Sequence, residues 1–152
     1  MNAPLRRPEP ADPGFAARCR ASFARQKAMA LIGARLASIE PGRCEIELDW
    51  RADLTQQKGF LHGGVVGMIA DTACGYAAYS LMPATSSLVT VEYKINMLAP
   101  GRGKRFVARA EVLKAGRSLT VTRGEVLADG DALCAVMQQT LMMLPDTSDT
   151  PE

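Results

Sequence analysis

The chain has 152 residues, of which 47% are hydrophobic and 22% are charged, and its formal net charge is +2 at pH 7. These values are typical of one soluble domain and exclude a strongly basic surface, so we expect no nucleic-acid partner. No apolar run could span a membrane, and residues 1–12 lack the apolar stretch of a signal peptide. The four cysteines form no CxxC pair, which predicts no zinc site and favours reduced thiols in a cytoplasmic protein.

The N-terminal part predicts a disordered segment followed by one helix. Residues 1–11 contain three prolines and are expected to be disordered. Asp12 followed by Pro13 is typical of a helix start. Apolar side chains then recur at helical spacing, which predicts one apolar stripe made by Phe15, Ala16, Cys19 and Phe23.

Two strands are predicted next, because the apolar period changes to two. Ile32, Ala34 and Leu36 fall on one face of the first strand, which ends at a turn over residues 41–43. Residues 44–50 then alternate apolar and acidic side chains, which predicts a half-buried strand with one solvent-exposed face.

A long buried helix is predicted after a loop at residues 51–62. The chain from Gly63 to about Met82 is apolar on nearly every side, a pattern typical of a helix without a wet face. Such a helix is ~30 Å long, about the width of a small domain. Pro83 is expected to end it.

The remainder of the chain predicts four hairpin-linked strands. They lie at residues 90–97, 106–112, 119–127 and 132–144. The alternation in the third of them changes near Gly124, which predicts a β-bulge there. The fourth is apolar on both faces, so we expect it to be central in the sheet.

These elements predict the fold class α+β. Because four sequential strands favour an antiparallel sheet and one apolar helix must be covered, we expect a curved antiparallel sheet wrapped around one long buried helix. The domain is predicted to span residues 12–144, and the polar residues 145–152 are predicted to be a flexible tail.

The segment GFLHGGVVGMIAD, at residues 59–71, holds the candidate site. A carboxylate inside an apolar helix is costly unless it is paired, so Asp71 predicts a general base or nucleophile for hydrolysis; the alternative is a structural carboxylate that bonds a neighbouring group. Gly63 and Gly64 open the helix, whose free N–H groups can hold an oxyanion. His62, the only histidine, is expected mainly to cap or brace the loop.

The spacing of the two candidate groups bears on assembly. Asp71 lies eight positions after Gly63, which is roughly 12 Å along a helix, so one carbonyl cannot touch both groups of the same chain. If both act, they come from two copies of the chain, which predicts a two-fold dimer with composite sites.

The same segment resembles the hotdog-fold thioesterases of the phenylacetate-degradation (PaaI-like) type. The resemblance covers roughly residues 30–144 and rests on Gln56, Gly59, residues 62–64 and Asp71. The later segment PGRGKRFVARAEVLKAGR is similar to the bacterial branch that acts on medium- and long-chain acyl-CoA. The resemblance implies a hotdog fold and hydrolysis of acyl-CoA without a metal or other cofactor, since coenzyme A is part of the substrate. It also implies a homodimer or a dimer of dimers.

The resemblance further implies residue roles. The carboxylate at Asp71 would act as general base or nucleophile, and the Gly63 N–H would polarise the thioester carbonyl from the other subunit. The amide of Gln56 would place the carbonyl or the attacking water, and the Thr90 hydroxyl would orient that water. Some relatives place a hydroxyl four residues after the carboxylate, where this chain has Gly75.

A basic cluster on a predicted turn is the candidate phosphate site. Arg102, Lys104 and Arg105 could hold the phosphates of coenzyme A, with Gly64 also near the substrate. The alternative is a solvated turn without a ligand.

Two other functions stay open beside hydrolysis. One is a hotdog module that binds acyl-CoA without cleaving it, and the other is a hotdog dehydratase or hydratase, which the lack of a second histidine disfavours. The acyl group is expected to be a medium or long aliphatic chain, in a flexible pocket lined by Met68, Met82, Met97 and Leu98.

Overall fold

The computed structural model describes residues 8–150 and has one sheet and one long central helix. Two short helices precede the sheet, and a single 3-10 turn, η1, lies in the loop before the long helix. The elements, in chain order, are α1 (Phe15–Ala24), α2 (Lys27–Ile32), β1 (Arg35–Glu40), β2 (Arg43–Asp49), η1 (Ala52–Leu54), α3 (Gly63–Tyr79), β3 (Ser86–Met97), β4 (Arg105–Ala115), β5 (Leu119–Ala128) and β6 (Ala132–Pro145).

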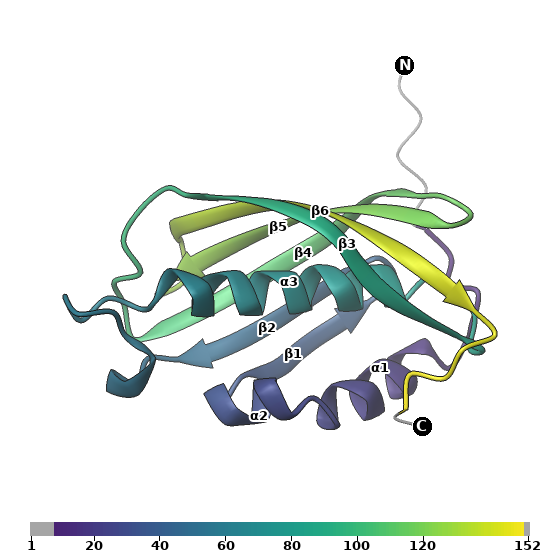
Figure 1. The fold of residues 1–152 in the computed structure, drawn as a ribbon, viewed down its shortest axis with the longest axis horizontal. Coiled ribbons are helices and arrows are strands. Elements are labelled where there is room, and N and C mark those ends of the chain that lie inside the picture. The colour runs from purple at the N-terminus through teal and green to yellow at the C-terminus, as the bar shows by residue number, and fades with distance from the viewer. Residues whose placement is uncertain (1–7, 151–152) are drawn as a thin grey trace, which may run out of the picture.

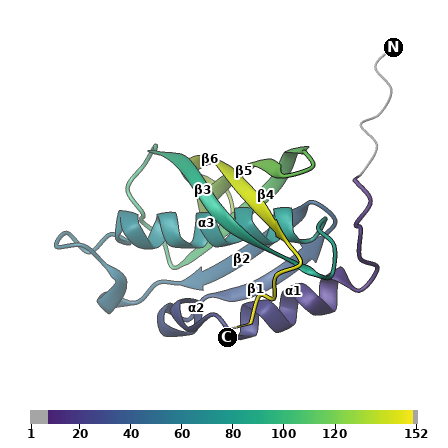
Figure 2. The same cartoon turned by 45° about the vertical axis from the view of Figure 1, so that its right-hand side comes forward.

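The six strands form one antiparallel sheet in the order β1-β2-β4-β5-β6-β3. The sheet curves around α3, and α1 and α2 lie near β1 (Figures 1 and 2). β6 lies between β5 and β3, so its predicted central position is confirmed. The predicted fold class, a curved antiparallel sheet around one long helix, is confirmed as well.

The core forms between α3 and the concave face of the sheet. On β2, the alternation predicted from the sequence puts Cys44, Ile46 and Leu48 on the buried face. Their partners on β4 include Phe106 and Ala108, which are also buried. Small and large apolar side chains thus face each other beneath α3, which leaves room for a helix at close range.

The N-terminal region differs from its prediction in two places. α1 begins at Phe15 rather than at Asp12, whose carboxylate accepts a hydrogen bond from the Gly14 N–H instead. A second helix, α2, was not predicted, and Ile32 ends this helix rather than opening a strand. Gly33 adopts φ 76°, the left-handed conformation that ends helices, so β1 starts only at Arg35.

The long helix is shorter than predicted at its C-terminus. α3 ends at Tyr79, before the expected end near Met82. The Arg18 guanidinium donates hydrogen bonds to the carbonyl oxygens of Tyr79 and Met82, so a cation satisfies acceptors at this helix end.

The bulge predicted at Gly124 is wrong. Gly124 pairs in register with Met137, and the irregularity between β5 and β6 lies between Val126 and Leu127. The physical reason for the glycine is close approach: a Cβ built at this position would lie 2.9 Å from the Sγ of Cys74 on α3. The missing side chain lets the helix pack against the middle of β5.

We expect Gly124→Ala to lower the free energy of unfolding by about 1–3 kcal/mol, because it overpacks the contact with Cys74. Urea denaturation would measure the change. Gly67→Ala is the matched control, since a Cβ there would meet no atom within 4 Å and alanine favours a helix. Equal destabilisation by both variants would contradict the packing argument.

Residues 1–11 were predicted to be disordered, and residues 1–7 of that segment lie outside the described part of the chain. Residues 151 and 152 of the predicted flexible tail lie outside it as well. Near the C-terminus, the carboxylate of Asp149 forms an ion pair with Arg25 of the α1 end. Between residues 8 and 150, no helix is both long and apolar enough to cross a membrane.

Candidate active site

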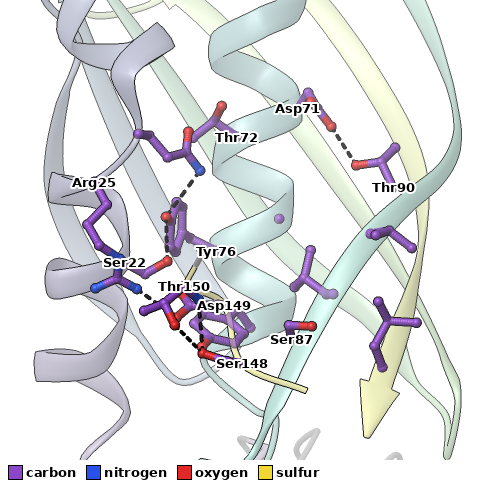
Figure 3. A pocket seen from close by; sticks show the side chains of 16 residues that line it. Ser22, Arg25, Asp71, Thr72, Tyr76, Ser87, Thr90, Ser148, Asp149 and Thr150 are labelled. Carbon is purple, nitrogen blue, oxygen red and sulfur yellow. Dashed lines mark hydrogen bonds and ion pairs between the residues drawn. The ribbon is translucent and has the colours of Figure 1, made fainter. Parts of the chain in front are cut away.

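Asp71 lies half-buried on α3 and lines a cavity of about 520 Å³ between α1, α3 and β3. Figure 3 shows its carboxylate pointing toward Thr90 on β3. The Thr90 hydroxyl donates to Asp71 Oδ1 at 2.9 Å, and Gln139 Nε2 of β6 donates to the same oxygen at 2.6 Å. Gln139 Nε2 also donates to Thr90 Oγ1 at 2.8 Å, so the three side chains form a closed triangle.

This triangle leaves the two carboxylate oxygens of Asp71 unequal. Two donors hold Oδ1, while Oδ2 receives no hydrogen bond from any residue between 8 and 150. Two donors on one oxygen fix the plane of the carboxylate. The free oxygen is then available to accept a proton or to attack a carbonyl carbon.

Gln139 was missed in the sequence. It is 1% exposed and lies on the core-facing side of β6, where its neighbours on that face, Met137 and Leu141, are apolar. Its Oε1 is buried without a hydrogen-bond partner in the described part of the chain. The available signal was one glutamine in the buried register of an apolar strand, because a buried amide needs a partner.

A β-bulge lies directly beside Thr90. Thr90 pairs with Leu141 and Glu92 pairs with Thr140, so Val91 is an extra residue in β3. Bulges re-aim neighbouring side chains and occur near active sites. The structure therefore brings the Thr90 hydroxyl to the Asp71 carboxylate.

Gln56 and Gly63 line a separate cavity of about 340 Å³. A turn places Gln56, since its N–H donates to the Phe60 carbonyl oxygen and its own carbonyl accepts from the Gly59 N–H, both at 2.9 Å. Gly59 has φ 80°, a conformation that favours glycine. The predicted site residues therefore fall in two groups, Asp71 with Thr90 and Gln56 with Gly63.

His62 caps α3, which agrees with its expected bracing role. Its Nδ1 accepts the Gly64 N–H at 2.8 Å, so this nitrogen carries no proton. The Gly64 N–H therefore already has an acceptor. The Gly63 N–H has no acceptor within residues 8–150, so at this helix end it is the N–H group that could bind a ligand oxygen.

The basic residues of the turn have different partners. The Arg102 guanidinium lies 5.0 Å from the centre of the Phe60 ring, next to the Gln56 and Gly63 cavity. The Arg105 side chain forms an ion pair with Asp49 at 3.2 Å. Hydrogen bonds from Arg35 and, second, from Arg105 lower the pKa of the Asp49 carboxyl. The Lys104 side chain has no ion pair among the described residues.

The predicted methionine-lined pocket is not beside Asp71. None of Met68, Met82, Met97 and Leu98 lines the cavity that holds the carboxylate, and only Met97 lines the cavity of Gly63. The sequence could not show which face of each element turns toward the cavity. Among residues 8–150, no three His, Cys, Asp or Glu side chains lie close enough to hold a metal ion.

The sequence and the fold of this chain are similar to those of known proteins. The family model described as "Thioesterase superfamily" matches residues 58–135, which contain both α3 and the Thr90 strand. A solved structure of a thioesterase family protein from Silicibacter pomeroyi is 48% identical, covers 87% of this chain and 99% of that one, and has a TM-score of 0.84. The PaaI protein of Escherichia coli is 20% identical over 88% of this chain and 98% of that one, with a TM-score of 0.79, and shares the fold.

Two sequence relatives carry substrate names. The 1,4-dihydroxy-2-naphthoyl-CoA hydrolase of Listeria monocytogenes is 26% identical over 72% of this chain and 89% of its own length. The medium/long-chain acyl-CoA thioesterase YigI of Salmonella typhimurium is 28% identical over 57% of this chain and 64% of its own length. The predicted hotdog thioesterase resemblance is confirmed. This chain, with a long helix under a curved sheet and a carboxylate on that helix, belongs to the thioesterase superfamily.

Proposed function

We propose that the protein hydrolyses acyl-CoA thioesters to a free acid and coenzyme A, with Asp71 as general base or nucleophile. The observation that carries this proposal is the Asp71 carboxylate, which lines a ligand-sized cavity and is held through one oxygen by Thr90 and Gln139. As a base, Oδ2 takes a proton from water while the water oxygen attacks the thioester carbon. The C–S bond then breaks, and the thiolate leaves and takes up a proton.

The oxyanion site is proposed to come from the partner subunit. Asp71 and Gly63 line different cavities of one chain and are separated by roughly 12 Å along α3. A two-fold dimer would bring the Gly63 N–H and the Gln56 amide of one copy to the Asp71 of the other.

The edge of the sheet supports such a dimer. β3 ends the sheet and carries apolar side chains that remain exposed: Val91 at 54%, Tyr93 at 49% and Met97 at 48%. A long exposed edge strand with apolar side chains is a favourable surface for pairing with another chain. A second copy of β3 is the proposed partner.

Coenzyme A is proposed to reach the site past the turn after β3. Arg102 and Lys104 are the basic side chains there without an ion pair in the described structure, whereas Arg105 is paired with Asp49. Cations at a cavity rim suit the phosphates of coenzyme A. The proposed substrate site thus places Arg102 next to the Gly63 cavity.

Free-thiol release from a panel of acyl-CoA esters tests the proposed activity. We expect the wild-type protein to hydrolyse at least one ester, with binding followed in parallel by calorimetry. Binding of acyl-CoA without thiol release would overturn the hydrolase proposal in favour of a binding module. The dehydratase alternative is disfavoured, because the sequence has a single histidine, His62, and its Nδ1 serves as a helix cap.

We expect a heterodimer of Asp71→Asn and Gly63→Val to recover about half of the wild-type activity, although each homodimer is inactive. In the heterodimer, one composite site carries both substitutions and the other carries neither. Valine keeps the backbone N–H, but its side chain would fill the cavity space through which a thioester carbonyl approaches that N–H. The fold should tolerate the substitution, because the nearest atom to the Cβ, at 3.4 Å, is the flexible end of Met97. Co-expression with two affinity tags gives the heterodimer, and an inactive heterodimer would show that each site lies within one chain.

A further inference from the structure

The chain after β6 runs across one end of the Asp71 cavity. β6 ends at Pro145, and Asp146 adopts φ 52°, a left-handed conformation that turns the chain. Figure 3 shows Asp71 at one end of the cavity and residues 148–150 at the other. All three of these C-terminal residues line the cavity. We call residues 146–150 the strap, because they cross the end of the cavity opposite the carboxylate.

The strap is fixed where it leaves the sheet. The Thr147 hydroxyl accepts a hydrogen bond from Ser87 Oγ of β3 at 2.9 Å and donates one to the Leu144 carbonyl oxygen at 2.5 Å. Ser87 is itself buried. These bonds hold Thr147 on the edge of the sheet, so the part of the strap that can move begins after this residue.

The tip of the strap is held by the end of α1. Arg25 donates from one guanidinium nitrogen to Asp149 Oδ1 at 2.6 Å and from another to the Ala21 carbonyl oxygen at 3.0 Å. Ser148 and Thr150 form hydrogen bonds with each other. Within residues 8–150, the bond from Arg25 is the one hydrogen bond that joins residues 148–150 to the rest of the chain. The position of the tip therefore depends on a single ion pair.

This ion pair is exposed enough to break at small cost. The Arg25 side chain keeps 41% of its exposure and the Asp149 side chain 24%. Exposed ion pairs contribute little net stability, and dissolved salt screens them. The tip of the strap can therefore leave α1 while Thr147 stays bound to Ser87.

The strap also separates two cavities. Ser148 and Asp149 line the Asp71 cavity and a second cavity of about 400 Å³, to which Arg18 and Thr85 also contribute. Because the same two strap residues line both cavities, they lie between them. Movement of the tip away from α1 would join the second cavity to the first.

The closed cavity has a limited length. Tyr79, the last residue of α3, lines it and lies eight residues after Asp71, about 12 Å along the helix. Leu88, Val89 and Leu144 contribute apolar side chains to the lining, which suit an alkyl chain. An extended hexanoyl chain is shorter than this distance and an extended palmitoyl chain is longer. A palmitoyl chain that starts at Asp71 would therefore reach the strap.

We propose that the strap is the end wall of the acyl cavity and that the Arg25–Asp149 pair limits the length of the acyl chain that the enzyme accepts. With the pair formed, the cavity ends at the strap. With the pair broken, a long chain continues into the second cavity. Arg25 and Asp149 thus determine specificity without touching the reacting atoms. The proposal rests on the proposed acyl-CoA hydrolysis.

The test is the ratio of kcat/KM for palmitoyl-CoA to that for hexanoyl-CoA, measured by free-thiol release below the concentration at which palmitoyl-CoA forms micelles. We expect Asp149→Asn to raise this ratio by roughly 2- to 5-fold, the range that an exposed ion pair can supply. The gain should come from a lower KM for palmitoyl-CoA, because opening the strap admits the chain and leaves the reacting groups in place. The matched control is Asp146→Asn, which makes the same charge change in the strap at a side chain that does not line the Asp71 cavity. It should keep the wild-type ratio.

Salt gives a second readout. An ionic strength of about 0.5 M should raise the ratio of the wild-type protein and of Asp146→Asn more than that of Asp149→Asn, which has no ion pair left to screen. An unchanged ratio in Asp149→Asn, an equal rise in Asp146→Asn, or the same salt response in all three proteins would overturn the role of the strap, while hydrolysis of hexanoyl-CoA would remain. Failure to hydrolyse any ester would overturn the proposed function itself.

Discussion

Replacing Asp71 by asparagine should lower kcat for acyl-CoA hydrolysis by on the order of 10²-fold or more. The amide keeps the shape of the side chain and an oxygen that can accept from Thr90 and Gln139, but it can neither take a proton nor form an acyl intermediate. Free-thiol release with the best ester of the panel measures the loss. The melting temperature should stay close to that of the wild type.

The control for this substitution is Asp131→Asn, which removes an exposed carboxylate at the β5–β6 turn. Its kcat should match the wild-type value. Wild-type activity in Asp71→Asn would show that the carboxylate is structural, and the acyl-CoA site would then need another base.

Gln139→Met should separate activity from stability. It removes the amide that holds Asp71 Oδ1, so we expect kcat to fall by on the order of 10-fold or more as the carboxylate loses its fixed orientation. It also removes two hydrogen bonds from Nε2, which destabilises, and a buried Oε1 without a partner within residues 8–150, which stabilises, so the free energy of unfolding should stay within about 1 kcal/mol of the wild-type value. Steady-state kinetics and urea denaturation measure the two effects.

Gln138→Met is the matched control, because Gln138 lies next to it on the exposed face of β6. It should leave kcat unchanged. A loss of stability in parallel with the loss of activity would assign Gln139 to packing only.

The elements that were predicted well depend on local patterns. Alternation on β2 and the continuous apolar sequence of α3 follow from the two periods of side-chain direction, which neighbouring residues determine. α2 was missed because six residues are too short for a clear helical period, and Gly33, whose positive φ ends that helix, was not recognised as its stop signal.

The site residues also differ in whether local sequence could identify them. Asp71, Gly63 and His62 could be named from their order in one segment, because a helix and its first turn are local structures. Gln139 could not, since it lies 68 positions after Asp71 and only the sheet brings β6 over α3. The reason for Gly124 was likewise hidden, because Cys74 approaches it from another element.

By itself, the sequence determined the fold class, the catalytic candidate and the distance between Asp71 and Gly63, because periodicity and helical rise are properties of neighbouring residues. Only the tertiary structure decided that Thr90 and Gln139 hold one oxygen of Asp71 and that Gly63 lines a different cavity. These features depend on which faces of distant elements meet, and packing of the whole chain determines that contact.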